Sequence, residues 1–481
     1  MKCITKEAYK LLHEGVIALA EIESNGIAID VDYLKKAIVS VTNTIKEIKE
    51  QLKKDKIYKA WVKRFGDKAN LNSPYQLGEV IFKVLKYPRV EELEEDDKEE
   101  NDEAAFRHLY LPFLVDYFRY RKLEKAVGTY LKGIQRETVD GFIHPFFDLH
   151  SVVSYRSGSS APNFQNMPAR NKEVMELIRK CFIPRKNRRL VEIDFSGIEV
   201  RVACCVTKDP KLIEDFTTPG KDPHRDTASK LFNLDIDYLI QNKDWAKKTV
   251  RDWAKNRFVF PEFYGSVYFQ CAPHIWEVAS DERIKLPTSG ISIKDYLLSK
   301  GITELGECDP KQRPRTGTFE AHVRSVEKDF WKVRFKVYDQ WKHDWWENYL
   351  KQGGFQIATG FWVEWSKAGL PKFNNATNTP IQGPAFHCLL WCLIQLQKWL
   401  TKNKFKSKIV GQIHDSIVLD VVESELQDVL NRAYYLMSKK LLQHWEWIIV
   451  PMETETEITP IDSSWNTKEQ WIAENGIWKK K

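Results

Sequence analysis

The sequence has little of what marks secreted and membrane proteins. Its eight cysteines form no C-x-x-C pair and no metal-ligand spacing, which argues against a disulfide framework and predicts reduced, mostly buried thiols. Its longest apolar stretch, 385–400, is interrupted by polar residues and falls short of a membrane span. The first ten residues, MKCITKEAYK, lack the pattern of a signal peptide. We therefore expect a cytoplasmic protein without a membrane anchor.

The chain also has little net charge, +7 over 481 residues, but this charge is unevenly distributed. Residues 91–103 hold ten acidic residues and one lysine, a charge of −9, so subtracting them from +7 leaves +16 on the remainder. A basic body attracts polyanions, whereas the acidic run is typical of a solvated loop. With 43% hydrophobic residues, the chain can bury cores for two to four subdomains.

Two distant segments each place an aspartate at the end of an apolar strand. In LVEIDFSGIEVR (190–201) the strand leads into Asp194, and Glu199 follows five positions later. In IHDSIVLDV (413–421), Asp415 lies at a tight turn between two apolar runs. Two strand-borne aspartates suit a two-metal site for phosphoryl transfer. A strand-end aspartate is more often a cap or turn residue, so neither segment alone identifies such a site.

Residues 241–265 predict a basic helix followed by aromatic residues. Arg251 and Lys255 are four residues apart, hence on one helical face, where paired cations can bind a triphosphate. The following aromatics, Phe258, Phe260, Phe263 and Tyr264, are suited to stacking on a base. Pro261 is expected to kink or end the helix because it lacks a backbone N–H.

The rest of the chain alternates helical regions with loops. Apolar spacing predicts two helices in 5–58, separated near Ser24–Gly26, and further helices in 104–134, 327–350 and 382–400. Turn residues dominate 142–168, and 353–365 predicts a β-hairpin. We interpret 280–326 as an insertion without catalytic residues.

Taken in order, these segments resemble the motifs of family A DNA polymerases, the bacterial DNA polymerase I type. DFSGIEVR resembles the first palm motif, RDWAKNRFVFPEFYG the fingers helix and QIHDSIVL the last palm motif. Six further stretches match in the same order: EIESNGIAID, LNSPYQL, YRKLEKAVGTYL, SYRSGSSAPNFQNMP, DPHRDTASKLF and NTPIQG. The resemblance spans most of the chain and favours a phage enzyme, which would act in the host cytoplasm.

The resemblance implies a mixed α+β right-hand fold with an antiparallel-sheet palm, helical fingers and a helical thumb. The expected parts are an N-terminal palm-associated helix (1–30), the thumb with its acidic loop (31–140), the palm with the first catalytic aspartate (141–210), the fingers with the insertion (211–370), and the palm with the second catalytic aspartate and the C-terminal segment (371–481).

The resemblance also implies roles for individual residues in nucleotide addition. Asp194 and Asp415, with the Phe195 carbonyl, would bind two Mg²⁺ ions, for which Mn²⁺ could substitute. Arg251 and Lys255 would hold the nucleotide's phosphates, and Lys255 would also protonate the departing pyrophosphate.

Further residues would surround the nucleotide and the DNA. His224 would assist with the phosphates, Glu199 would exclude ribonucleotides, and Tyr264 would guard the template-base position. The residues expected to touch primer–template DNA are Arg156, Asn163, Gln165, Gln382 and His414.

Three features depart from the family pattern. The spacing from Lys255 to Tyr264 is one residue longer, so counting back from Tyr264 gives Phe260 as the sugar-stacking aromatic, whereas counting forward from Lys255 gives Val259. Phe260 is favoured, and Phe258 on the same segment stays open. Ser416 stands where the family usually has glutamate. The acidic run 91–103 lies in a thumb region that is usually basic.

The expected activity is template-directed DNA synthesis by a monomer that binds primer–template DNA and dNTPs. Only about 190 residues precede Asp194, so we expect no proofreading exonuclease on this chain; a separate exonuclease or processivity protein could supply such functions. The first alternative is a single-subunit RNA polymerase, which shares Tyr-Gly-Ser and His-Asp-Ser motifs. The second is a non-catalytic primer–template binding protein.

Overall fold

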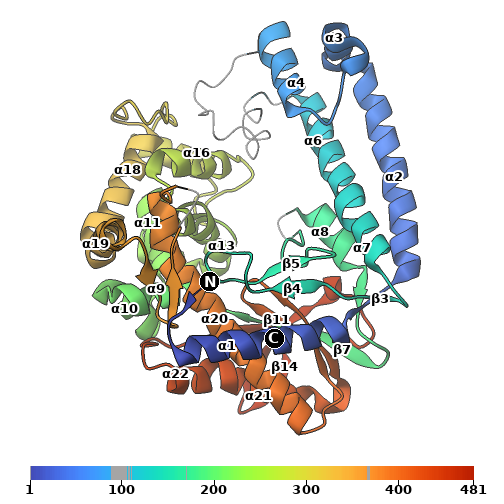
Figure 1. The fold of residues 1–481 in the computed structure, drawn as a ribbon. Helices are drawn as coiled ribbons and strands as arrows, with labels where there is room; N and C mark the ends of the chain where they lie inside the picture. The colour runs from blue at the N-terminus through green and yellow to red at the C-terminus, as the bar shows by residue number, and fades with distance from the viewer. Residues whose placement is uncertain (1, 88–105, 107–108, 110, 169–170, 366–368) are drawn as a thin grey trace.

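The structure is a computed structural model that describes residues 2–87, 106, 109, 111–168, 171–365 and 369–481. The acidic run 91–103 lies outside the described residues. Within these residues the fold combines helices with four antiparallel sheets, which confirms the mixed α+β class (Figure 1).

A six-stranded antiparallel sheet forms the centre of the molecule. Its strands lie in the order β10 (Lys408–Ile413), β11 (Ser416–Val422), β7 (Arg188–Phe195), β12 (Thr454–Ile458), β13 (Glu469–Glu474) and β14 (Ile477–Lys480). β11 is buried on both faces along most of its length, as its run of Ile, Val and Leu predicts. The strand–turn–strand prediction around Asp415 is confirmed.

A layer of helices packs against this sheet (Figure 1). α1 (Lys6–Asn25) packs on β10 and on α20 (Phe373–Lys402), which in turn contacts β10 and β11. α20 starts earlier than the predicted 382 because the helix continues through Pro380 and Pro384. α21 (Leu426–Tyr435) and α22 (Leu441–His444) complete this layer.

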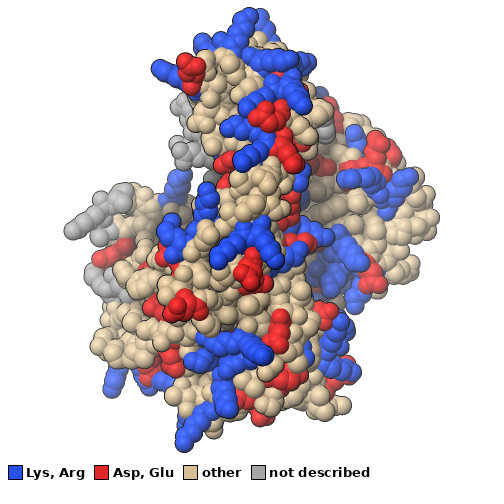
Figure 2. All heavy atoms as spheres, turned by 90° about the vertical axis from the view of Figure 1, so that its right-hand side faces the viewer, with Lys and Arg blue, Asp and Glu red and all other residues tan. Residues whose placement is uncertain are grey.

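A second helical group extends away from the sheet (Figure 1). It contains α2 (Val31–Lys54), α3 (Lys56–Phe65), α4 (Pro74–Gly78), α6 (Pro112–Lys125) and α7 (Lys132–Glu137), with π-helical turns at Glu79–Val84 and Ala126–Leu131. α2 packs against α6, and Gly26 separates α1 from the strand β2 (Ile27–Ile29). Exposed lysines crowd the end of α2 and α3, in the upper part of Figure 2.

The third group of helices lies across from the second in Figure 1. It contains α9 (Ile198–Thr207), α10 (Pro210–Thr217), α11 (Pro223–Phe232), α12 (Ile236–Gln241), α13 (Lys243–Lys248), α14 (Val250–Ala254), α15 (Phe260–Phe263), α16 (Tyr268–Ala279), α17 (Ile293–Ser299), α18 (Phe319–Asp329) and α19 (Lys336–Gln352). Two π-helical turns, η6 (Lys255–Val259) and η7 (Phe330–Arg334), interrupt this series. An aromatic cluster of Phe263, Phe330, Trp331 and Tyr338 joins α15 to η7 and α19.

Short elements connect these groups. They are β1 (Lys2–Cys3), β3 (Phe142–Ile143), β4 (Phe146–Asp148), β5 (Gly158–Ser160), α8 (Lys172–Arg179), β6 (Phe182–Ile183), β8 (Phe355–Gln356) and β9 (Phe361–Val363). β8 and β9 pair as the hairpin predicted in 353–365.

All eight cysteines are free thiols, and six of them are buried, as predicted. No helix in the described part of the chain combines the length and apolar composition that a membrane crossing requires. The predicted subdomain boundaries remain predictions.

Candidate active site

The central sheet brings the two predicted aspartates together. β7 and β11 are antiparallel, with Asp194 opposite Ser416, and the Phe195 N–H donates to the Asp415 carbonyl at 3.3 Å. Only His414 and Asp415 separate the paired residues Ile413 and Ser416, and His414 adopts a positive φ of 51° that such a tight turn requires. Segments more than two hundred residues apart thus place their carboxyl groups at one end of the sheet.

The two carboxyl groups repel each other in a partly buried environment. Burial, followed by the charge of Asp415, raises the pKa of Asp194. Burial also raises the pKa of Asp415, against the opposing effects of a backbone hydrogen bond and Arg156. Asp194 Oδ1 is buried without a hydrogen-bond partner among the described residues. These observations describe a pair of carboxylates that a cation would stabilise.

The residues at this position fit a divalent ion that takes part of its ligands from a substrate. The donors that the paired strands bring together are the carboxylates of Asp194 and Asp415. No group of three or more His, Cys, Asp or Glu in the described ranges is arranged to hold a metal. Mg²⁺ is commonly bound by one or two carboxylates together with substrate phosphates, so the small donor set is suitable.

Ser416 does not replace the carboxylate that the family usually has at this position. Its side chain is buried, and its hydroxyl donates to the Ile413 carbonyl at 3.0 Å. Ser416 therefore stabilises the turn that carries Asp415.

The phosphate-binding candidates lie on the helical segment formed by α14, η6 and α15. The Phe260 N–H donates to the Lys255 carbonyl, a bond across five residues that defines a π-helical turn. This turn absorbs one additional residue, so Lys255 and Phe260 remain one helical turn apart, with Lys255 Nζ 5.3 Å from the Phe260 ring centroid. The longer spacing noted in the sequence has its structural explanation here.

The three candidate sugar-stacking residues, Phe258, Val259 and Phe260, differ in how far they are buried. Phe258 and Val259 are buried, and Phe258 packs edge-on against Phe330. Phe260 is only partly buried and meets the His224 ring at 5.8 Å. The geometry therefore favours Phe260.

His224 lies in the first turn of α11 and is uncharged at neutral pH. Burial, together with the charges of Arg251 and Lys255, lowers the pKa of His224 to about 3. Its Nδ1 is buried and has no partner among the described residues. A neutral imidazole beside two cations is suited to hydrogen bonding with an anion.

A pocket lies between α9, α15 and α20. Its lining includes Glu199, Phe260, Tyr264 and Gln382. The Tyr264 hydroxyl donates to Glu199, and Arg156 Nη1 lies 3.4 Å from the same carboxylate. Gly265 follows Tyr264 at φ +93°, where an added Cβ would overlap the Asn374 amide.

Two of the loop residues predicted to contact DNA, Gln165 and Asn163, make hydrogen bonds within the protein. Gln165 holds the turn that carries Asp415, because its Oε1 accepts the His414 N–H at 2.7 Å and its Nε2 donates to Gln412. Asn163 accepts the Asn166 N–H at 3.1 Å, so its carbonyl oxygen closes a local turn.

Two site residues were not singled out from the sequence. The buried Gln412 donates to the His414 carbonyl at 2.6 Å and accepts from Ser157, and its polar side chain in an apolar strand was the available signal. Asp222 accepts from Arg251 at 2.6 Å, and its signal was an aspartate just before a proline that starts a helix.

The sequence profile of DNA polymerase family A matches residues 35–280 and 367–466, well over half of the chain. The chain belongs to DNA polymerase family A. This confirms the family predicted from the motifs; the phage origin stays a prediction. The match omits 281–366, which contains nearly all of the predicted insertion 280–326.

Known family A polymerases are similar to this chain over most of its length. It is 28% identical over 417 residues to DNA polymerase I of Lactococcus lactis subsp. lactis, covering 85% of this chain and 41% of the relative. It is 25% identical over 450 residues to DNA polymerase I of Bacillus subtilis (91% and 44%) and 25% over 412 residues to the DNA polymerase of Bacillus phage SP01 (81% and 39%). The chain spans about two fifths of the length of these relatives.

Among solved structures, the chain is similar to the POL domain of Pol1 from M. smegmatis in complex with DNA primer-template and dNTP. The TM-score is 0.70 with 22% identity, covering 95% of this chain and 70% of that chain. This likeness concerns the fold, and it confirms the polymerase fold expected from the sequence.

Proposed function

We propose that this chain is a DNA-directed DNA polymerase, which adds dNTPs to a primer 3′-hydroxyl on a template and releases pyrophosphate. The observation that carries the proposal is the pairing of β7 with β11, which places Asp194 and Asp415 together. Glu199 and Tyr264, which would meet the incoming nucleotide, line one pocket. Membership of DNA polymerase family A supports the same activity.

Asp194, Asp415 and the Phe195 carbonyl would hold two divalent ions, with Mg²⁺ preferred. Bound there, the ions would make the primer hydroxyl a better nucleophile and neutralise the leaving pyrophosphate. Arg251 and Lys255 bind the phosphates and oppose the negative charge that builds on them. Lys255 donates a proton to the departing pyrophosphate.

The surrounding residues select the nucleotide and hold the duplex. Glu199, fixed by Tyr264 and Arg156, occupies the space of a 2′-hydroxyl, and Phe260 packs on the sugar. His224 hydrogen-bonds the phosphates as a neutral donor. The residues facing the minor groove or backbone are Arg156, Asn163, Gln165, Gln382 and His414.

A single-subunit RNA polymerase is the second candidate, because Tyr264–Ser266 and His414–Ser416 read Tyr-Gly-Ser and His-Asp-Ser. Glu199 argues against it, since a carboxylate at the 2′ side of the sugar favours deoxynucleotides. A non-catalytic binding protein would have no need for both aspartates and both phosphate-binding cations.

Primer extension with Mg²⁺ and either dNTPs or rNTPs, on matched and mismatched primer ends, tests the proposal. We expect extension with dNTPs and little with rNTPs, and the mismatched end reports whether the purified protein excises a terminal nucleotide. Preferential use of rNTPs would favour the RNA polymerase, and no extension with either nucleotide would contradict both.

A further inference from the structure

Asp222 joins the helix that carries His224 to the helix that carries Arg251. Its Oδ1 accepts the Arg225 N–H at 3.2 Å and caps the N-terminus of α11. Its Oδ2 accepts from Arg251 Nε at 2.6 Å. The two side chains are only 24% and 28% exposed, so solvent screens this ion pair less than one at the surface.

The contact through Nε determines how the Arg251 guanidinium is presented. Nε lies at the base of the planar fork, and the two Nη groups project beyond it. Within the described ranges, the Arg251 side chain makes no other hydrogen bond or ion pair. Asp222 therefore fixes the plane of the fork and leaves both Nη groups for a ligand.

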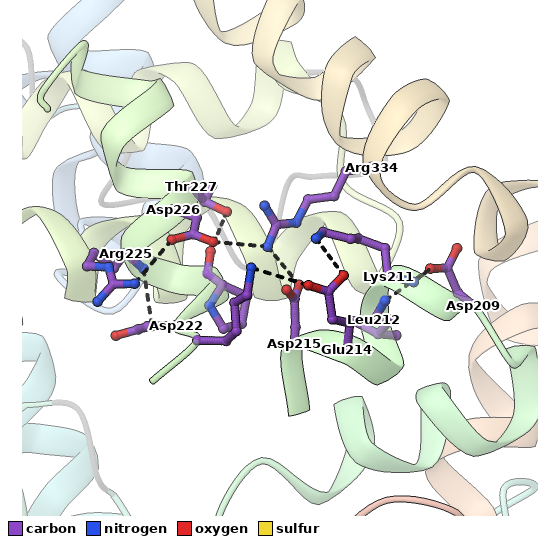
Figure 3. Close-up of polar contacts among 12 residues, drawn as sticks. Asp209, Lys211, Leu212, Glu214, Asp215, Asp222, Arg225, Asp226, Thr227 and Arg334 are labelled. Atoms are coloured by element: carbon purple, nitrogen blue, oxygen red, sulfur yellow. Dashed lines mark hydrogen bonds and ion pairs between the residues drawn. The ribbon is translucent and has the colours of Figure 1, made fainter. Parts of the chain in front are cut away.

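The first turn of α11, which Asp222 caps, is also held by contacts that do not involve Arg251. In Figure 3, Arg334 bridges α10 and α11 by pairing with Asp215 at 2.7 Å and Asp226 at 3.3 Å. Asp215 is fully buried, and Arg334 is 12% exposed. Thr227, in the same turn of α11, donates to the Pro223 carbonyl at 2.7 Å. The start of α11 is thus held before any nucleotide binds.

We propose that Asp222 is a positioning residue for the incoming nucleotide, which holds Arg251 through Nε so that both Nη groups meet the triphosphate. The inference rests on the proposed function, because that function supplies the triphosphate. A guanidinium that is already oriented loses less conformational freedom on binding, so the contact strengthens nucleotide affinity. Asp222 acts through Arg251 and touches no reacting atom.

The experiment compares Asp222→Asn, Arg251→Ala and the double variant in steady-state primer extension with dNTPs. Asparagine caps helices as well as aspartate does, so Asp222→Asn keeps α11 and removes only the charge that holds Arg251. Asp235→Asn is the control for loss of a capping carboxylate, because Asp235 caps α12 by accepting the N–H groups of Asp237 and Tyr238 and has no hydrogen bond to Arg251 among the described residues. Thermal midpoints of all variants report on folding.

We expect Asp222→Asn to raise KM for dNTP about tenfold, with kcat changed less than about twofold, as the loss of one charge-assisted hydrogen bond predicts. It should add nothing further in the Arg251→Ala background. An unchanged KM in Asp222→Asn, or equal effects with and without Arg251, would overturn the inference while wild-type extension still supports the proposed function. A wild type that extends no primer would instead contradict the proposed function.

Discussion

Among single residues, Asp194 and Asp415 are the pair that most needs an external partner. Their carboxyl groups come from adjacent antiparallel strands, burial raises the pKa of both, and one oxygen of Asp194 has no partner in the described part of the chain. Two repelling carboxylates are unfavourable without a cation. They are well suited to binding metal together with a nucleotide's phosphates.

Glu199→Ala should increase the use of ribonucleotides. In the structure Glu199 is held by Tyr264 and Arg156, so alanine would open space beside the sugar. We expect the ratio of rNTP to dNTP incorporation to rise about tenfold, a typical effect of a small change in pocket volume. Single-nucleotide incorporation kinetics measure it, with the exposed Glu282→Ala as control. Unchanged selectivity would remove Glu199 from this role.

Residues that form contiguous motifs could be found from the sequence, whereas residues that act through distant contacts could not. Asp194, Lys255 and Asp415 stand within recognisable segments. Asp222 meets Arg251 across 29 residues, and Gln412 meets Ser157 across 255, so only the folded chain shows these pairs. Alignment of side chains across a sheet or between helices depends on packing that no local pattern records.

At the level of elements, the π-helical turn Lys255–Val259 accommodates the extra residue between Lys255 and Tyr264. Arg251 precedes the turn, Lys255 is its first residue, and Phe260 and Tyr264 follow it. One extra residue in a straight α-helix would rotate these pairs by about 100° relative to each other. The turn holds the extra residue locally, so both pairs can face the same side.

Deletion of Asn256 should therefore leave primer extension within about tenfold of wild type, because the π turn can close to an α turn around the exposed Asn256. Deletion of Asp252, between Arg251 and Lys255, should cost about a hundredfold or more, because it rotates one cation away from the other. Extension assays on both deletions, with thermal midpoints, make the comparison. Equal losses would show that the turn does not absorb the residue.

The same helical segment contains a buried acidic residue, Glu262, on α15. Glu262 is 1% exposed, accepts from Trp331 Nε1 at 2.8 Å, and is also approached by Cys271, Glu327 and Lys342. Burial, followed by the charge of Glu327, raises the pKa of Glu262 to about 8. Lys342 stacks on the Trp331 ring, 3.2 Å from its centroid.

Glu262→Gln should make stability less sensitive to pH. The unfolded carboxyl loses its proton near 4.5 and the folded one near 8, so the wild-type free energy of unfolding falls as the pH rises between these values. Glutamine can still accept from Trp331 and does not titrate. We expect the variant to gain at least about 1 kcal/mol relative to wild type between pH 5 and pH 9.

Urea unfolding at these two pH values measures the difference, with the exposed Glu282→Gln as control. A constant difference between wild type and Glu262→Gln would mean that Glu262 is ionised throughout.

Helices and strands with a strong apolar periodicity could be predicted from the sequence, but irregularities within helices could not. The helices α1 and α2 and the hairpin around Asp415 follow their apolar patterns. The passage of α20 through Pro380 and Pro384 and the π turn at Lys255–Val259 depend on tertiary packing that overrides local preference.

Across the whole molecule, the central sheet brings together segments that are far apart in the sequence. β7 and β11 supply the aspartates, and the elements beyond Asp194 supply Arg251, Lys255 and the pocket lined by Glu199 and Tyr264. The exposed lysines of α2 and α3 give the group that extends from the sheet a basic surface (Figure 2). The family relationship and the fold are consistent with this arrangement of sheet and helices.

The most direct measurement is Mg²⁺-dependent primer extension by Asp194→Asn and Asp415→Asn beside wild type. Asp428→Asn, an exposed position on α21, is the control for loss of one carboxylate. We predict that wild type and the control extend the primer, and that both site variants bind DNA but add no nucleotide. Retained extension by either site variant would contradict the assignment of these two aspartates to the metal site.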